Sequence, residues 1–197
     1  QIEDKSGSAE IQQVNPDKKS DALSEKEQVN PNEQGDALPK DIFTLDIVAD
    51  YYHKKLVSNK NAIEYLKARG ITNEAINHFK IGFCDGTLKE KVGTEGFDKL
   101  RSKGLFTEKG YELFSNCIVV PLTDSNDQVL SFYGRSINPR AKVQHLYLTG
   151  KHKAVFNEKA YKVYDQIILT ESVIDALSLF SVGIHNVSCI YGTQGLT

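Results

Sequence analysis

Residues 166–175 read Gln-Ile-Ile-Leu-Thr-Glu-Ser-Val-Ile-Asp and combine a short apolar run with two carboxylates. The apolar run is typical of a strand, and Thr170 or Ser172 can cap a helix that follows it. In an open α/β sheet, ligands bind outside the carboxyl ends of the strands. We therefore expect Glu171 to face a site there, with Asp175 one turn further along the same helix face.

A purely structural interpretation of both carboxylates is also open. Negative side chains near a helix N-terminus complement the helix macrodipole. Glu171 and Asp175 could therefore serve the helix alone, and the neighbouring sequence has to decide between the two interpretations.

Charge is distributed unevenly along the chain of 197 residues. Residues 1–41 hold 10 Asp or Glu against 5 Lys or Arg, whereas residues 42–197 hold 16 against 19. The first segment has no aromatic residue and cannot bury enough apolar surface to offset chain entropy, so we expect a disordered acidic linker. It repeats Gln-Val-Asn-Pro at 13–16 and 28–31, which favours duplication of a linker over a repeat fold.

Cysteine and histidine spacing gives no sign of a zinc site. Cys84, Cys117 and Cys189 form no Cys-x-x-Cys pair, so we expect reduced packing residues of a cytoplasmic protein, with a disulfide left open. No stretch approaches the roughly 20 apolar residues of a membrane span, and the polar start is not a signal peptide. The sequence starts with Gln and stops after a turn-like, glycine-containing run, which suggests a fragment.

Apolar periodicity predicts three short helices after the linker. The first covers 42–56 with Thr44 as N-cap, the second covers 61–69, and the third starts at Thr72. A glycine-rich, charged stretch follows, and another small helix is expected at 97–103.

Residues 117–122 and 129–133 are expected to be two strands joined by a loop of turn-forming residues. The second strand leads into Gly134 and Arg135. Glycine lets a backbone approach a ligand closely, and arginine offers a forked donor for phosphate. A lone arginine is, however, most often a solvated surface residue.

The segment 135–162 weakens that surface interpretation, because it holds seven basic residues against one acidic residue. The seven are Arg135, Arg140, Lys142, Lys151, Lys153, Lys159 and Lys162. Clustered cations interleaved with aromatic residues are typical of surfaces that meet phosphate backbones and bases. Here they come directly before the carboxylates of 166–175, and this pairing suits polyphosphate chemistry, in which carboxylates hold divalent cations and basic side chains neutralise phosphate.

Taken in chain order, these segments resemble the catalytic core of the bacterial DnaG-type DNA primases over about residues 43–197. The matching stretches are Tyr-Leu-Lys-Ala-Arg-Gly-Ile at 65–71, Phe-Lys-Ile-Gly-Phe at 79–83, Asn-Cys-Ile-Val-Val-Pro at 116–121, Phe-Tyr-Gly-Arg at 132–135, Glu171 with Asp175, and Tyr-Gly-Thr-Gln-Gly-Leu-Thr at 191–197. Glu171 and Asp175 resemble the first motif of the Toprim fold, which forms part of that core.

The resemblance implies an α/β fold, with an α+β N-terminal subdomain followed by the first part of a Toprim Rossmann-like parallel sheet. It divides the chain into a disordered acidic linker at 1–41, a catalytic-core N-terminal subdomain at 42–162 and a truncated start of the Toprim domain at 163–197. It implies an enzyme that synthesises short RNA primers on a single-stranded DNA template by metal-dependent nucleotidyl transfer. The implied partners are ribonucleoside triphosphates and a replicative helicase, without a membrane.

Carried over by position, Glu171 is the Toprim glutamate, which would bind Mg²⁺ or Mn²⁺ or act as general acid or base, and Asp175 is its supporting acid. The groove for template or nucleotide phosphates would contain Arg135, Lys142, Lys151 and Lys153. The sequence Gln-His-Leu-Tyr-Leu-Thr-Gly at 144–150 departs from the usual primase pattern. Which lysine here corresponds to which lysine of the family therefore stays open. Such departures are typical of a diverged primase, such as one from a mobile element.

Toprim enzymes also place an Asp-x-Asp metal pair downstream of the glutamate, and this sequence ends 26 residues after Glu171 without one. We expect the remaining metal ligands outside these residues, zinc only in a domain that precedes them, and no activity from the fragment alone. A Toprim topoisomerase or nuclease, and a non-catalytic nucleic-acid-binding module, stay open as alternatives. A downstream Asp-x-Asp pair would favour polymerisation, and a tyrosine nucleophile would favour a topoisomerase.

Overall fold

The computed structural model describes residues 43–148 and 154–190. The expected linker, Lys151, Lys153 and the segment 191–197 lie outside these residues. All the described residues belong to one compact unit. Among them, no helix is both long enough and apolar enough to cross a membrane.

Three helices open the described chain, as the sequence predicts. They are α1 (Leu45–Ser58), α2 (Lys60–Ala68) and α3 (Asn73–His78). The first N–H groups of a helix have no partner inside it, so a side-chain oxygen commonly accepts one of them. The side chains that do this are Thr44, Asn59 and Thr72. The expected caps at Thr44 and Thr72 are therefore confirmed.

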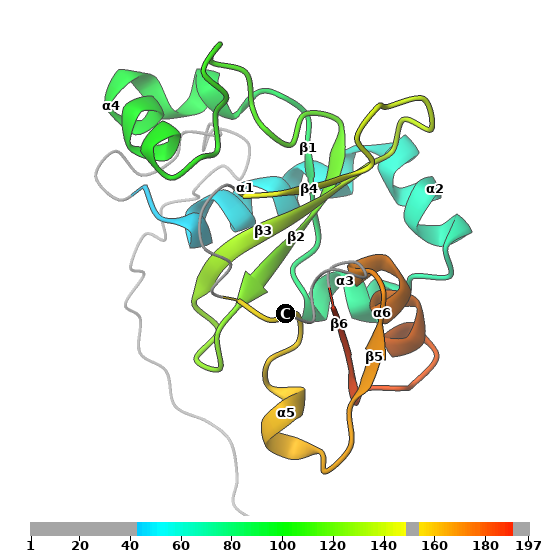
Figure 1. The fold of residues 1–197 in the computed structure, drawn as a ribbon. Coiled ribbons are helices and arrows are strands. Elements are labelled where there is room, and N and C mark those ends of the chain that lie inside the picture. The colour runs from blue at the N-terminus through cyan, green and yellow to red at the C-terminus, as the bar shows by residue number, and fades with distance from the viewer. Residues whose placement is uncertain (1–42, 149–153, 191–197) are drawn as a thin grey trace, which may run out of the picture. The chain divides into compact units, whose positions relative to one another are not determined.

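A four-stranded antiparallel sheet forms the centre of the unit, with the strand order β1-β2-β3-β4 (Figure 1). Its strands are β1 (Gly82–Cys84), β2 (Cys117–Thr123), β3 (Val129–Ser136) and β4 (His145–Tyr147). The predicted β2–β3 turn is present, and the Asp124 carboxylate organises it by accepting from the N–H groups of Asn126 and Gln128, at 2.8 and 2.9 Å. The β2–β3 register brings Arg135 opposite Ile118.

Helix α4 (Leu88–Ser102) corrects the expectation of a small helix at 97–103. The helical stretch starts nine residues earlier and is interrupted at Gly93, whose φ of 62° and ψ of −174° are not helical. Leu88 and Val92 are buried, so tertiary packing stabilises a turn that its glycines and charges make unfavourable in isolation. Local composition alone could not reveal this contribution.

A second, two-stranded sheet follows the short helix α5 (Ala160–Val163). Strands β5 (Ile168–Thr170) and β6 (Val187–Cys189) run parallel and are connected by α6 (Val173–Ser181). The expected strand at the start of the motif is confirmed, but Ile168 and Leu169 keep 42% and 48% of their surface exposed. Strand β5 pairs with β6. The exposure of Ile168 and Leu169 shows that the described residues do not cover both faces of β5.

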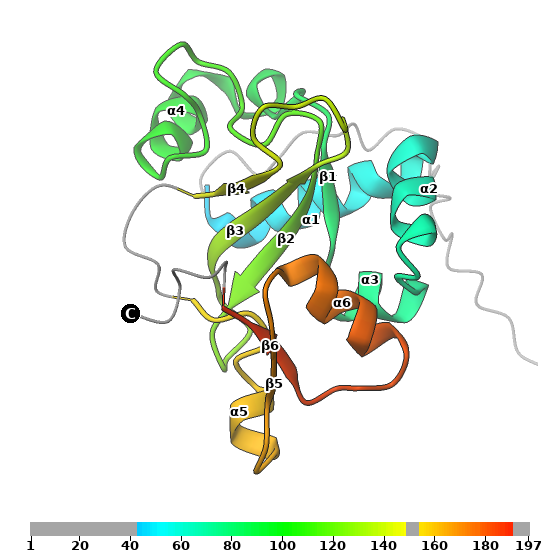
Figure 2. The same ribbon diagram turned by 45° about the vertical axis from the view of Figure 1, so that its right-hand side comes forward.

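Both faces of the four-stranded sheet are buried, because alternate residues of a strand point to opposite sides. On β2, Cys117 and Val119 belong to a core shared with α1 and α4. Ile118 and Val120 belong to a second core, which includes residues of α2, α3, α6 and β6. Both views show α6 beside α3 near one end of the sheet (Figure 1, Figure 2). The two sheets are thus joined through one apolar core.

The three cysteines are buried free thiols, as expected for packing residues. Cys84 also takes part in a buried polar cluster around Glu112, which is only 6% exposed. The Glu112 carboxylate accepts from the Tyr52 hydroxyl at 3.0 Å, the Cys84 thiol at 2.9 Å and the Leu88 N–H at 2.7 Å. Burial raises the pKa of Tyr52 and Cys84 well above their usual values, so both keep the protons that they donate.

We predict that Glu112→Gln lowers the free energy of unfolding by about 1 to 3 kcal/mol, because the amide has one acceptor oxygen and turns an N–H₂ group toward buried donors. Urea unfolding measures this change. Glu108→Gln is the matched control, since Glu108 is exposed, and it should stay within about 0.5 kcal/mol of the unchanged chain. Equal stabilities for the two variants would contradict a clamping role for Glu112.

Candidate functional site

A cavity of about 430 Å³ opens where the end of β3 and the end of β5 come together. Its lining residues are Arg69, Arg135, His145, Tyr147, Glu171, Ser172, Ile174 and Asp175. Two of these are arginines and two are carboxylates. Of the predicted site residues, the structure brings Glu171, Asp175 and Arg135 into this one cavity.

The acidic side of the cavity comes from the β5–α6 junction, with one correction to the expected geometry. Glu171 precedes the N-cap Ser172, so it is not on the helix, and the argument that it shares a helix face with Asp175 is wrong. The two carboxylates nevertheless line the same cavity. The Ser172 hydroxyl donates to the Asp175 carboxylate at 2.7 Å and accepts from the Asp175 N–H at 3.3 Å. Asp175 thus has a structural role at the start of α6 and also lines the cavity.

The basic side of the cavity is held by a chain of hydrogen bonds around Arg135. Its Nε donates to the Tyr65 hydroxyl at 3.0 Å, and its Nη1 is bonded to His145 Nε2. The other ring nitrogen of His145 is bonded to the Tyr133 hydroxyl at 2.9 Å. The guanidinium of Arg69 lies 5.1 Å from the centroid of the Tyr65 ring, in cation–π contact.

No site role was expected for Arg69, although it lies within the stretch 65–71 that resembles the primases. Its position directly after α2 was the available signal, because it follows Tyr65 by one helical turn. No site role was expected for His145 either. Its role depends on pairing between β3 and β4, which places it opposite Arg135. A three-residue strand gives little sequence signal for such a pairing.

Two other expectations concern Lys142 and Gly134. Lys142 is exposed in the loop between β3 and β4 and does not line the cavity. Gly134 was expected to let the backbone approach a ligand, but a Cβ there would come 2.3 Å from Cδ1 of Phe114. Glycine is therefore required at this position for the packing of Phe114 on the sheet.

The opposite charges in the cavity do not neutralise one another directly. Within the described residues, no ion pair of 4 Å or less joins Arg69 or Arg135 to Glu171 or Asp175. A ligand that carries both phosphate and a cation can therefore meet cationic and anionic groups at the same time. Arginine suits phosphate because its planar fork donates two parallel hydrogen bonds.

The chemistry of the carboxylates fits a hard divalent cation such as Mg²⁺ or Mn²⁺, which prefers oxygen ligands. Across 43–148 and 154–190, however, no group of three or more His, Cys, Asp or Glu side chains is arranged to hold a metal ion. Glu171 and Asp175 can thus supply part of a coordination sphere but not the whole of it.

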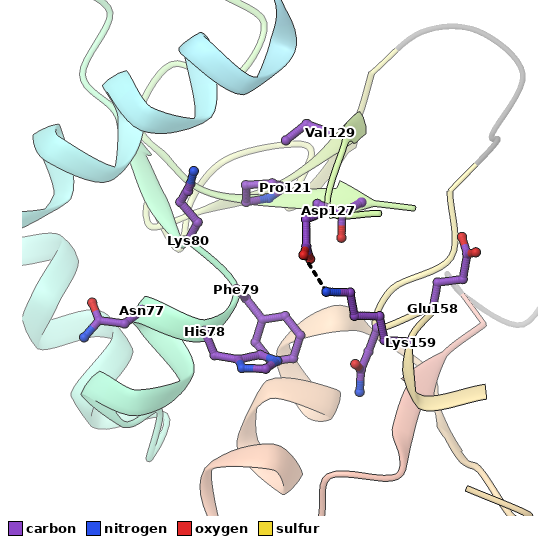
Figure 3. Close-up of a pocket in the computed structure, with 11 residues that line it drawn as sticks. Asn77, His78, Phe79, Lys80, Pro121, Asp127, Val129, Glu158 and Lys159 are labelled. Carbon is purple, nitrogen blue, oxygen red and sulfur yellow. Dashed lines mark hydrogen bonds and ion pairs between the residues drawn. The ribbon is translucent and has the colours of Figure 1, made fainter. Parts of the chain in front are cut away.

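A second cavity, of about 460 Å³, lies between the end of α3, the β2–β3 turn and residues 157–159 (Figure 3). Its two lysines are already paired with carboxylates. Lys159 is paired with Asp127 at 2.5 Å, and Lys80 is paired with Asp50 at 2.7 Å. Because these cations are engaged, this cavity is a weaker candidate for binding phosphate than the one that contains Arg135.

Comparison with known proteins gives a consistent result. Residues 51–167 match the family model described as the N-terminal domain of the DNA primase catalytic core. A DNA primase of Aquifex aeolicus is 32% identical over 169 residues, which cover 76% of this chain and 33% of that protein. The chain spans about a third of the length of the curated relatives that it matches.

Solved structures agree with this match. The crystal structure of the zinc-binding and RNA polymerase domains of Aquifex aeolicus primase has a TM-score of 0.63 and 28% identity, and covers 74% of this chain and 40% of that chain. A DnaG primase catalytic domain bound to single-stranded DNA has a TM-score of 0.65 and 24% identity, and covers 76% and 54% of the two chains. The predicted mixed α/β class and catalytic-core fold are confirmed.

We predict that Ser172→Ala lowers the free energy of unfolding by about 1 kcal/mol, because alanine cannot accept the N–H of Asp175 at the start of α6. Thermal or urea unfolding of the chain measures the loss. Ser172→Thr keeps a capping oxygen and should lose only a few tenths of a kcal/mol. If alanine and threonine cost the same, the capping function assigned to Ser172 is wrong.

Proposed function

Because this chain belongs to the DnaG-type DNA primase family, we propose that it works in template-directed synthesis of short RNA primers on single-stranded DNA. We propose the same division of the chain as the sequence suggests, with the N-terminal subdomain of the catalytic core at 42–162 and the start of a Toprim domain from 163. The change from an antiparallel to a parallel sheet between β4 and β5 supports this boundary.

The observation that carries the proposal is the cavity in which two arginines face two carboxylates. Nucleotidyl transfer needs cations to neutralise phosphate and carboxylates to bind divalent metal, in one place. The first sheet contributes the cation, because Arg135 comes from β3. The second sheet contributes the carboxylates, because Glu171 and Asp175 come from the β5–α6 junction.

In this proposal Arg135 and Arg69 bind phosphate oxygens of the template or of an incoming ribonucleoside triphosphate. Glu171 binds Mg²⁺ or Mn²⁺ or acts as general acid or base, and Asp175 supports it. A bound divalent cation would supply charge neutralisation and activation of the primer 3′-hydroxyl. The protein contributes by positioning the reacting groups and by stabilising charge with preorganised donors.

The wider surroundings of the site are proposals of the same kind. In this proposal Lys142, Lys151 and Lys153, which follow Arg135 in the sequence, bind phosphates of the template strand. Binding of single-stranded DNA by a structural relative supports this role. The relative from Aquifex aeolicus includes a zinc-binding domain, which supports zinc in a preceding domain of the complete protein. We also propose the bacterial cytoplasm as the location and a replicative helicase as partner.

We predict that Glu171→Gln in the complete protein lowers primer synthesis by about 100-fold or more, because it removes the charge that holds metal or moves a proton. Glu171 is exposed, so the stability change should stay within about 1 kcal/mol. Incorporation of ribonucleotides on single-stranded DNA with Mg²⁺ is measured beside the melting temperature.

Glu108→Gln is the control for this experiment, because it removes an exposed carboxylate on the loop after α4 and should leave synthesis unchanged. Near-normal synthesis by Glu171→Gln would remove Glu171 from the chemistry. In that case the cavity would have to be interpreted as a binding surface alone.

A further inference from the structure

His145 uses both of its ring nitrogens within the cavity wall. Nδ1 is bonded to the Tyr133 hydroxyl at 2.9 Å, and Nε2 is bonded to Nη1 of Arg135. Tyr133 and Arg135 are two residues apart on β3, so both side chains leave the same face of the strand. His145 lies opposite Arg135 on β4, and the Tyr133 and His145 rings have centroids 5.8 Å apart.

The partners of the ring identify its protonation state. A guanidinium can only donate hydrogen bonds, so Nε2 of His145 must accept from Arg135. Nδ1 then carries the proton and donates it to the Tyr133 oxygen. Only the neutral imidazole has this arrangement, because a doubly protonated ring has no acceptor and would repel Arg135.

Electrostatics around the ring favour the same state. Partial burial, together with the Arg135 charge, lowers the pKa of His145 below its usual value, while Asp175 and Glu171 act in the opposite direction and Arg69 adds to the lowering. Burial also keeps Tyr133 protonated, since it raises the pKa of that hydroxyl. The tyrosine can therefore stay in place as a neutral partner of the ring.

Arg135 is held by two partners on different elements. Tyr65 of α2 accepts from Nε at 3.0 Å, and His145 of β4 accepts from Nη1. Two such bonds fix both the position and the plane of the guanidinium. Three of its five N–H groups are left for a ligand. A side chain that is already oriented loses less rotational entropy on binding, so its interaction with phosphate is stronger.

We propose that His145 is a positioning residue, which as a neutral imidazole orients the Arg135 guanidinium toward a phosphate group in the cavity lined by Glu171 and Asp175. The inference rests on the proposed function. The phosphate belongs either to a ribonucleoside triphosphate or to the template strand, and binding of each can be measured separately.

The first test compares His145→Leu with His145→Gln in the complete protein. Leucine removes the acceptor, whereas the glutamine amide oxygen can replace Nε2. Leucine should raise the KM for ribonucleoside triphosphate, or the Kd for single-stranded DNA, by about tenfold, as expected for a weakened charge-assisted contact. Glutamine should restore the constant to within about threefold of the unchanged protein, with kcat altered less than KM. An equal loss in both variants would overturn the proposal.

A double-variant cycle separates positioning from a general effect on the fold. In an Arg135→Ala background, His145→Leu should have little further effect on the same constant, because the group it orients is gone. If His145→Leu causes the same tenfold loss in both backgrounds, His145 does not act through Arg135.

A readout that needs no activity is the ¹⁵N NMR spectrum of the imidazole in this chain. A protonated Nδ1 and an unprotonated Nε2 at neutral pH support the proposal, and the opposite tautomer overturns it. If the complete protein makes no primers but this chain shows the expected tautomer, the proposed function fails while the orientation of Arg135 stands. If the complete protein makes primers but His145 has the opposite tautomer, the proposed function stands and the positioning role of His145 fails.

Discussion

The apolar core between the two sheets is the constraint on which the candidate site depends. Leu177 and Phe180 of α6 are buried in the same core as Ile118 and Val120 of β2, and Phe156 joins them from the connecting segment. Each such side chain contributes about 1.5 to 3 kcal/mol when it leaves water. Because this burial fixes α6 against the first sheet, the carboxyl end of β5 has to lie near the end of β3. The cavity is the consequence.

Around that fixed junction, some polar groups have their hydrogen-bond partners within the fold, whereas others can still bind a ligand. Glu112 is fully engaged by donors from three segments and stabilises the fold on the side of α4. In the cavity, hydrogen bonds hold Arg135 and Asp175 in place without joining them to each other. Charges that are oriented yet not neutralised can interact strongly with a charged ligand, since no existing ion pair has to be broken first. The same feature distinguishes this cavity from the one around Lys159.

The sequence predicted those features that depend on local chemistry. Thr44 and Thr72 were expected as caps because a side-chain oxygen must accept the first helical N–H groups, and the β2–β3 turn was expected from its turn-forming residues. The start of α4 was missed because Leu88 gains its helical conformation from burial. Glu171 was placed on a helix because Ser172 was one of two possible caps, and sequence alone could not choose between them. The partnership of His145 with Arg135 depends on strand register, which short strands leave poorly specified.

We propose that Arg69 and Arg135 form a phosphate-binding surface beside the two carboxylates. The salt dependence of single-stranded DNA binding tests it most directly, because each phosphate contact releases counterions. For single strands, the slope of log K against log salt should become shallower by about 0.7 for each arginine changed to alanine. Arg101→Ala is the control, since Arg101 lies on α4 away from the cavity and should leave the slope unchanged. An unchanged slope for Arg69→Ala and Arg135→Ala would contradict the account.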